Sequence, residues 1–325
     1  MRNRLLPLAL IAACIALAAL PLGLNRYGNY VLSMWAVMSI AAIGLNLTLG
    51  YAGQISLAQG AFVGIGAYTG AIMTTAGWPM AAAAIVAILL CFVVGWLLGY
   101  PALRVQGHYL AFITLAFSTL AYLVFRNEEW LTKGIYGIID VPRPTIFGWS
   151  TRRPPDFAWF CLICLGLVSA AIWWLVRSPW GRAFVALREN PIRALSLGID
   201  TRRYTLMAFA IGSTLGGVAG LLYGPLVEFV DPTPFTLSLS LNLLLMVIVG
   251  GSGFFLGPFL GALIAVLLPE WLRFTGGLYL IIYALAVMVL LAVSPTGLLG
   301  ILDRWLAARS QRAASAQRAA AEAQL

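Results

Sequence analysis

The chain has 325 residues, of which 62% are hydrophobic and only 10% are charged. Soluble domains carry about 25% charged residues, so this composition excludes an ordinary soluble protein and predicts a helical integral membrane protein. The apolar blocks are too long and unbroken for the alternating strands of an outer-membrane barrel.

The chain begins with an apolar run, residues 5–24, that follows Arg2 and Arg4. This run is either a cleaved signal peptide or a retained membrane span. We favour a retained first span within residues 1–27, because the predicted topology needs a start inside the cell. Residues 28–176 then form a first half with five more spans, predicted at 30–49, 60–76, 80–100, 109–125 and 157–176. Between the last two of these spans lies the longest polar loop, residues 126–156, predicted to fold on the periplasmic side.

Residues 177–203 form an arginine-rich polar segment between two apolar blocks, here called the arginine island. It carries six of the 20 basic residues and only two acids, and such a segment cannot lie in hydrocarbon. Ser178-Pro179 predicts the start of one short helix, and Pro191 the start of a second that Gly198 can close. Two short helices on the cytoplasmic face indicate a docking site for another protein, or else an amphipathic loop lying among lipid headgroups.

The second half, residues 204–293, contains spans predicted at 204–227 and 236–249, one ending near Trp271, and one at 278–293. The first of these carries glycines every four residues, which predicts a smooth face for close helix packing: Gly212, Gly216, Gly220 and Gly224. Residues 294–325 are predicted to form a cytoplasmic tail.

The net charge of +9 could suggest nucleic acid binding, but its distribution favours a membrane topology. With ten spans and an internal N-terminus, the whole excess of +9 lies on the inner face. This is the positive-inside pattern of a plasma-membrane protein with both termini in the cytoplasm, and it explains the basic composition without nucleic acid.

Two glycine-interrupted segments are the candidate translocation pathway. The first, residues 50–60, and its counterpart, residues 250–258, bring irregular polar backbone to membrane depth, which is tolerated only inside protein or along an aqueous path. Simple packing by small residues is the alternative interpretation. The polar side chains predicted to line the pathway are Asn46, Thr48, Gln54, Ser56, Gln59 and Asn242.

Catalytic and metal-binding patterns are missing from the sequence. His108 is the only histidine, and Cys161 and Cys164 lack further ligands nearby, so packing explains this pair better than metal or redox chemistry. Lys133 is the only lysine, and a phosphate-binding loop needs a lysine beside its glycine-rich turn. We therefore expect no enzyme activity, no metal and no cofactor in this chain itself.

Several stretches together resemble one transporter family. LNLTLGYAGQISLAQGAFVGIGAYTGA (residues 45–71), GHYLAFITLAF (107–117), SPWGRAFVALREN (178–190), the block 246–262 and SPTGLLG (294–300) are similar, in this order, to branched-chain amino-acid ABC permeases of the LivM type. The resemblance covers roughly residues 28–302.

The resemblance implies an all-α polytopic membrane protein of about ten transmembrane helices, a type II ABC importer-like permease with two pseudo-related halves. It implies alternating access with four kinds of partner: a second homologous permease subunit, two cytoplasmic ATPase subunits that bind ATP, a periplasmic substrate-binding protein and the lipid membrane. The island matches the family's ATPase-contacting loop, which implies coupling roles for Arg182, Arg188, Glu189, Asn190, Arg193 and Gly198.

The substrate class stays open at this level. A branched-chain amino acid, another neutral amino acid, or a small amide such as urea would each fit the family. A sodium-coupled carrier acting alone and a non-transporting membrane scaffold are the competing functional classes, and transport assays with and without the ATPases separate them.

Overall fold

A computed structural model describes residues 20–102, 108–146, 149–272, 281–282, 285, 288 and 297–300. Most of the predicted first span (1–27), the tenth span (278–293) and the tail (294–325) lie outside the described residues, so these assignments stay predictions. The division of the chain into two related halves likewise stays a prediction.

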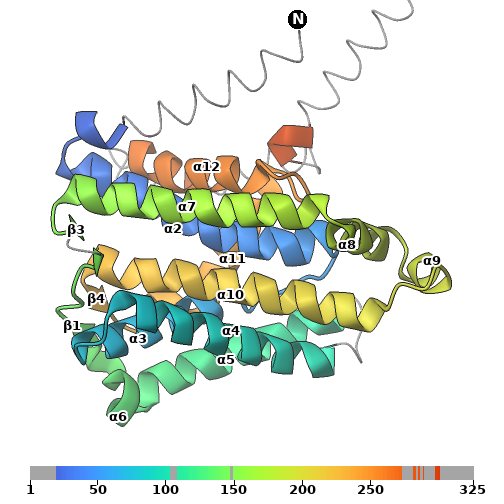
Figure 1. Ribbon diagram of the computed structural model, residues 1–325, viewed down its shortest axis with the longest axis horizontal. Helices are drawn as coiled ribbons and strands as arrows, with labels where there is room; N and C mark the ends of the chain where they lie inside the picture. Colours follow the sequence, from blue (N-terminus) through green and yellow to red (C-terminus); the bar gives the residue numbers. More distant parts are fainter. Residues whose placement is uncertain are drawn as a thin grey trace, which may run out of the picture.

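Helices dominate the described part of the chain (Figure 1). They are α2 (Arg26–Leu45), η1 (Asn46–Tyr51), α3 (Gln59–Thr75), α4 (Met80–Ala102), α5 (His108–Asn127), α6 (Glu129–Thr132), η2 (Gly134–Tyr136), α7 (Pro154–Arg177), α8 (Pro179–Glu189), α9 (Pro191–Ser196), α10 (Thr201–Val227), η3 (Thr233–Phe235), α11 (Leu237–Gly250) and α12 (Gly257–Trp271).

The bounds of these helices follow local sequence signals. Pro154, Pro179 and Pro191 each stand in the first turn of a helix, where the fixed φ of proline is favourable and its missing N–H is not needed. The second span differs most from its prediction, because α2 starts at Arg26 and continues through a π-helical turn to Tyr51. Asn25 caps its start by accepting a hydrogen bond from the Gly28 N–H at 2.7 Å.

Five helices of the described part are long and apolar enough to cross a membrane. They span Arg26–Tyr51, Met80–Tyr100, Tyr109–Asn127, Pro154–Arg177 and Thr201–Val227. Helices α11 and α12 are apolar but shorter. The chain is therefore a membrane protein, and the total of ten spans stays a prediction.

The loops at one end of the bundle depart from the all-helical expectation. Strand β1 (Ile138–Ile139) pairs antiparallel with β4 (Phe229–Val230), and β2 (Thr145–Ile146) pairs with β3 (Trp149–Ser150). The first pairing follows from the end of α10, where Glu228 adopts a left-handed conformation that reverses the chain. The loop 126–156, where described, is thus joined to the end of α10, opposite the end at which α8 and α9 lie (Figure 1).

Helix α10 lies at the centre of the bundle and packs against α2, α3 and α4. At three of the four glycines of its predicted face, atoms of neighbouring helices leave little or no room for a Cβ, whereas Gly224 has only ordinary contacts. A Cβ added at Gly212 would lie 2.7 Å from the Gly44 carbonyl of α2, and one at Gly216 would lie 3.0 Å from the Phe62 Cβ of α3. The four-residue spacing therefore serves helix packing, as the sequence predicted.

Replacing Gly220 with alanine tests this close packing. The new Cβ would overlap the Val63 carbonyl and lie 2.7 Å from the Ala67 nitrogen, so we expect a loss of about 1–3 kcal/mol in the free energy of unfolding. Gly166→Ala in α7 is the matched control, since a Cβ there meets nothing within 4 Å and the change should stabilise by about 0.5–1 kcal/mol. Thermal unfolding of the purified variants measures both, and equal stability would contradict the assignment of the glycine face.

Candidate functional site

The first glycine-broken segment follows the π-helical end of α2. After Tyr51 the chain leaves helical geometry until α3 begins at Gln59, and Gly53 within this break has a φ of +70°. The Leu57 N–H donates to Thr114 Oγ1 of α5 at 2.9 Å, so the irregular backbone finds a partner inside the protein. This is the condition under which a broken helix is tolerated at membrane depth.

The second segment, Gly251 to Leu256, separates α11 from α12. Gly251 and Gly253 have φ values of +117° and +84°, which side-chain-bearing residues rarely adopt. The glycines of this segment therefore allow a turn that other residues would strain.

Asn46, in the π-helical turn that leads into the first segment, ties this turn to the second segment. Its Nδ2 donates to the Phe254 carbonyl at 3.0 Å, and its Oδ1 accepts from the Gly253 N–H at 2.9 Å. The side chain is 3% exposed and satisfies a donor and an acceptor of a turn some 200 positions further along the chain. Asn46 is therefore a clamp between the two broken segments.

Arg188 of the arginine island contacts the same junction from the end of the bundle at which α8 and α9 lie. Its Nη1 donates to the Gly50 carbonyl. A Cβ at Gly53 would lie 3.2 Å from Arg188 Cγ, and one at Gly253 would collide with the guanidinium group. One arginine of the island thus touches both segments, and the missing side chains of two glycines provide the space for it.

Helix α8 packs firmly onto the body of the protein. Ser178 caps its start by accepting from the Trp180 N–H at 3.1 Å, and the absent side chain of Gly181 lets α8 rest on the end of α7 at Val176. The rings of Trp180 and Phe184 contact the ring of Tyr204 at the start of α10, with centroids 6.2 and 6.1 Å apart. The apolar face of α8 is therefore covered by protein.

Helix α9 is the outermost element of the island (Figure 1). Asn190 begins it by accepting hydrogen bonds from the N–H groups of Ile192 and Arg193 at 3.1 and 3.0 Å. Gly198 ends it with a φ of +80°, and the Gly198 and Ile199 N–H groups return to the carbonyls of Leu195 and Ala194. This is a Schellman closure, so the left-handed glycine anticipated at this position is present.

The remaining charged residues of the predicted coupling set lie on the surface. Arg182 and Glu189 on α8 and Arg193 on α9 are exposed, and no ion pair of these side chains is found within the described part of the chain. They are free to meet a partner, whereas Arg188 reaches back to the junction.

The residues predicted to line a pathway fall into separate environments. Gln59 is 2% exposed, and its Nε2 donates to the carbonyls of Ala41 and Gly212 at 3.0 and 3.1 Å, so it ties α3 to α2 and α10. Thr48 and Ser56 are buried and make only local hydrogen bonds. Gln54 is half-buried.

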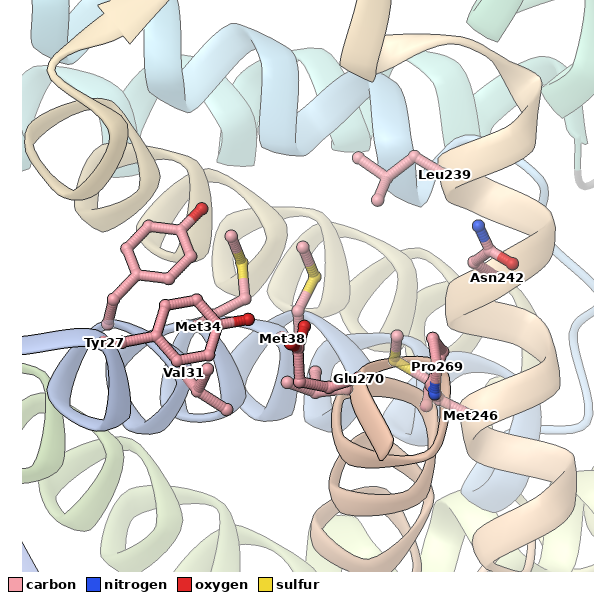
Figure 2. A pocket seen from close by; sticks show the side chains of 12 residues that line it. Tyr27, Val31, Met34, Met38, Leu239, Asn242, Met246, Pro269 and Glu270 are labelled. Atoms are coloured by element: carbon pink, nitrogen blue, oxygen red, sulfur yellow. The ribbon is translucent and has the colours of Figure 1, made fainter. Parts of the chain in front are cut away.

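Asn242 lies apart from the others, in a cavity of about 350 Å³ between α2, α11 and α12. Figure 2 shows side chains from these three helices directed into it: Tyr27, Met34 and Met38 from α2, Asn242 and Met246 from α11, and Glu270 from α12. Sequence reasoning missed all of these except Asn242. The helical spacing of Tyr27, Met34 and Met38 could have indicated them, but the same spacing is usual for core positions.

Within the described ranges, no three His, Cys, Asp or Glu side chains are arranged to hold a metal ion. Cys161 and Cys164 are both free thiols, the first buried and the second half-buried.

Comparisons with known proteins show the family of this chain. Residues 29–298 match the family model described as branched-chain amino acid transport system / permease component. The high-affinity branched-chain amino acid permease protein LivM of Escherichia coli is 33% identical over 82% of this chain and 68% of its own length. LivM of Salmonella typhimurium is 31% identical over 95% of this chain and 79% of its own, and LivH of E. coli is 27% identical over 82% and 92%. No solved structure gives a significant match.

Proposed function

Because this chain belongs to the family of branched-chain amino acid transport permease components, we propose that it is the membrane subunit of an ABC importer. In this proposal it carries branched-chain or similar neutral amino acids across the bacterial inner membrane. It works with a second permease subunit, two cytoplasmic ATPase subunits that bind ATP, and a periplasmic substrate-binding protein. The chain is a transport permease and not an enzyme, and ATP hydrolysis belongs to the partners.

One observation carries the proposal: Arg188 lies on the arginine island and contacts both glycine-broken segments. Helix α8 is packed on α7 and on the start of α10, so a force applied to the island moves these helices as well as the junction. The two segments are held together by Asn46. A tilt of α8 would withdraw Arg188 and allow the segments to part, which is the inner opening step of alternating access.

Helix α9 offers the surface on which the ATPase would act. Ile192 and Leu195 of α9 are 81% and 62% exposed, and Leu197 at its C-cap is 78% exposed. Exposed apolar side chains that are grouped and rimmed by charge mark protein interfaces, and Arg193 supplies the charge here. We assign the docking contact to α9 and the exposed Arg182 and Glu189, and the relay to Arg188.

Reconstitution in vesicles tests the proposed function. Together with its partner permease, ATPases and binding protein, the chain should accumulate L-leucine only when ATP is supplied on the ATPase side. The permease subunits alone should neither hydrolyse ATP nor accumulate leucine. Uptake by the isolated chain driven by a sodium gradient would refute the proposal in favour of a secondary carrier, and the absence of uptake from the complete assembly would also count against it.

The proposed topology has its own test. Ser196 on α9 and Thr145 on β2 are both exposed and lie at opposite ends of the bundle. In a variant whose native cysteines are replaced by alanine, Thr145→Cys should react with a membrane-impermeant maleimide in intact cells. Ser196→Cys should react only after permeabilisation. Labelling of Ser196→Cys in intact cells would reverse the orientation.

A further inference from the structure

The cavity between α2, α11 and α12 has features of a small-molecule site. Its volume of about 350 Å³ lies at the lower end of the range of about 300–1,000 Å³ that such pockets occupy. Most of its wall is apolar, with methionines from two helices, and a few polar groups converge on it (Figure 2). This combination of an apolar wall and few polar groups is typical of sites that hold a small, partly apolar ligand.

Asn242 is the polar group that the fold leaves unexplained. It lies within the apolar helix α11, its side chain is exposed to the cavity, and it makes no hydrogen bond to any residue that the structure describes. An amide without a partner at membrane depth is unfavourable unless water or a ligand satisfies it. Asn46 and Gln59, by contrast, use their amides to link helices.

The position of the cavity relates it to the junction. Along α2, the wall formed by Tyr27, Met34 and Met38 is followed by Asn46, which lies eight residues beyond Met38, or about 12 Å at 1.5 Å per residue. Along α11, Asn242 and Met246 are followed by the second glycine-broken segment. Both walls therefore lead from the cavity to the closed junction that Asn46 and Arg188 hold.

We infer that this cavity is a binding station for the transported amino acid before the inner junction opens, an inference that rests on the proposed function. Methionine is flexible and polarisable, so Met34, Met38 and Met246 suit a branched aliphatic side chain of variable shape. Asn242 supplies an amide that can donate to the carboxylate of the amino acid.

Transport by the complete, reconstituted assembly tests the station. Met38→Trp should lower ATP-driven uptake of L-leucine by at least about ten-fold, because an indole fills the space that the cargo needs. Asn242→Leu should also lower ATP-driven uptake of L-leucine. Met73→Trp is the matched control: Met73 lines a separate apolar groove between α3, α4 and α5, and this variant should retain uptake. All variants are compared at equal amounts of assembled transporter.

A thiol-labelling experiment distinguishes the loss of a binding site from a structural effect of these substitutions. In a variant whose native cysteines are replaced by alanine, Met38→Cys should be labelled by a small thiol reagent, and L-leucine delivered by the binding protein should slow this labelling. Thr145→Cys, in the outer loop, should be labelled equally with and without leucine. If wild-type uptake requires ATP but Met38→Trp and Asn242→Leu transport normally and leucine gives no protection, the station is refuted while the proposed function stands. If the wild-type assembly shows no ATP-driven uptake, the proposed function itself fails.

Discussion

Replacing Arg188 with alanine should uncouple ATP hydrolysis from transport, lowering the amount of L-leucine taken up per ATP hydrolysed by about ten-fold or more. A hydrogen bond from a charged donor contributes about 1.5–3 kcal/mol, and each 1.4 kcal/mol is about a factor of ten in an equilibrium. The Arg188 guanidinium donates to Gly50 and lies against Gly253, and the side chain begins beside Gly53. Its loss therefore removes the only observed side-chain link from the island to both segments within the described residues.

The ATPases should still co-purify with the Arg188→Ala variant, because the proposed docking surface is formed by α9 and not by the Arg188 side chain. Arg202→Ala is a matched control: Arg202 is an exposed arginine near the start of α10, at the same end of the bundle, and it makes no hydrogen bond or ion pair within the described part. Arg188→Lys adds a finer comparison. Lysine keeps the charge but lacks the planar fork, so it should restore coupling only in part. Wild-type coupling in both Arg188 variants would show that the contact has no part in the relay.

The sequence predicted those features of this fold that depend on local chemistry. Proline at the start of α8 and α9 and glycine at the end of α9 are signals read within a few residues, and the structure confirms them. The glycine face of α10 was predictable for a similar reason, because a four-residue period places small residues on one side of a helix.

Contacts between distant parts of the chain were beyond the same reasoning. Nothing in the pattern around Asn46 indicates that its amide would meet Gly253, and Arg188 reads as one more exposed arginine of a basic loop. The π-helical turn at Asn46–Tyr51 was also missed, since its sequence differs little from that of an ordinary helix end. The cavity went unrecognised because tyrosine and methionine at helical spacing look like a core stripe, and only the packing of α11 and α12 shows that the space beside them is open.

Asn46→Leu is expected to have the largest effect on the closed junction itself. Leucine has as many side-chain heavy atoms as asparagine but cannot donate or accept a hydrogen bond, so the Gly253 N–H would lose its partner and the Phe254 carbonyl would be left with the Gly257 N–H. An unsatisfied buried donor costs about 1–3 kcal/mol, so the variant should lower the stability of the purified chain by about this amount. Since the same bonds hold the two segments together, the variant should also pass substrate without ATP.

Thr48→Val is the control that distinguishes loss of the Asn46 hydrogen bonds from a general disturbance of the π-helical turn. Thr48 is as deeply buried as Asn46, but its hydroxyl bonds only to the Leu45 carbonyl of its own helix, and valine keeps the methyl group that packs near Gly212. Its loss should cost below about 1.5 kcal/mol, the usual net value of one such bond. Thermal unfolding measures the loss of stability in each variant. Efflux of preloaded L-leucine from vesicles without ATP measures the uncoupled passage of substrate. A leak in Asn46→Leu but not in Thr48→Val would establish the asparagine as the bond that keeps the inner end shut. Equal behaviour of the two variants would mean that burial in this turn, rather than the bridge to Gly253 and Phe254, sets the barrier.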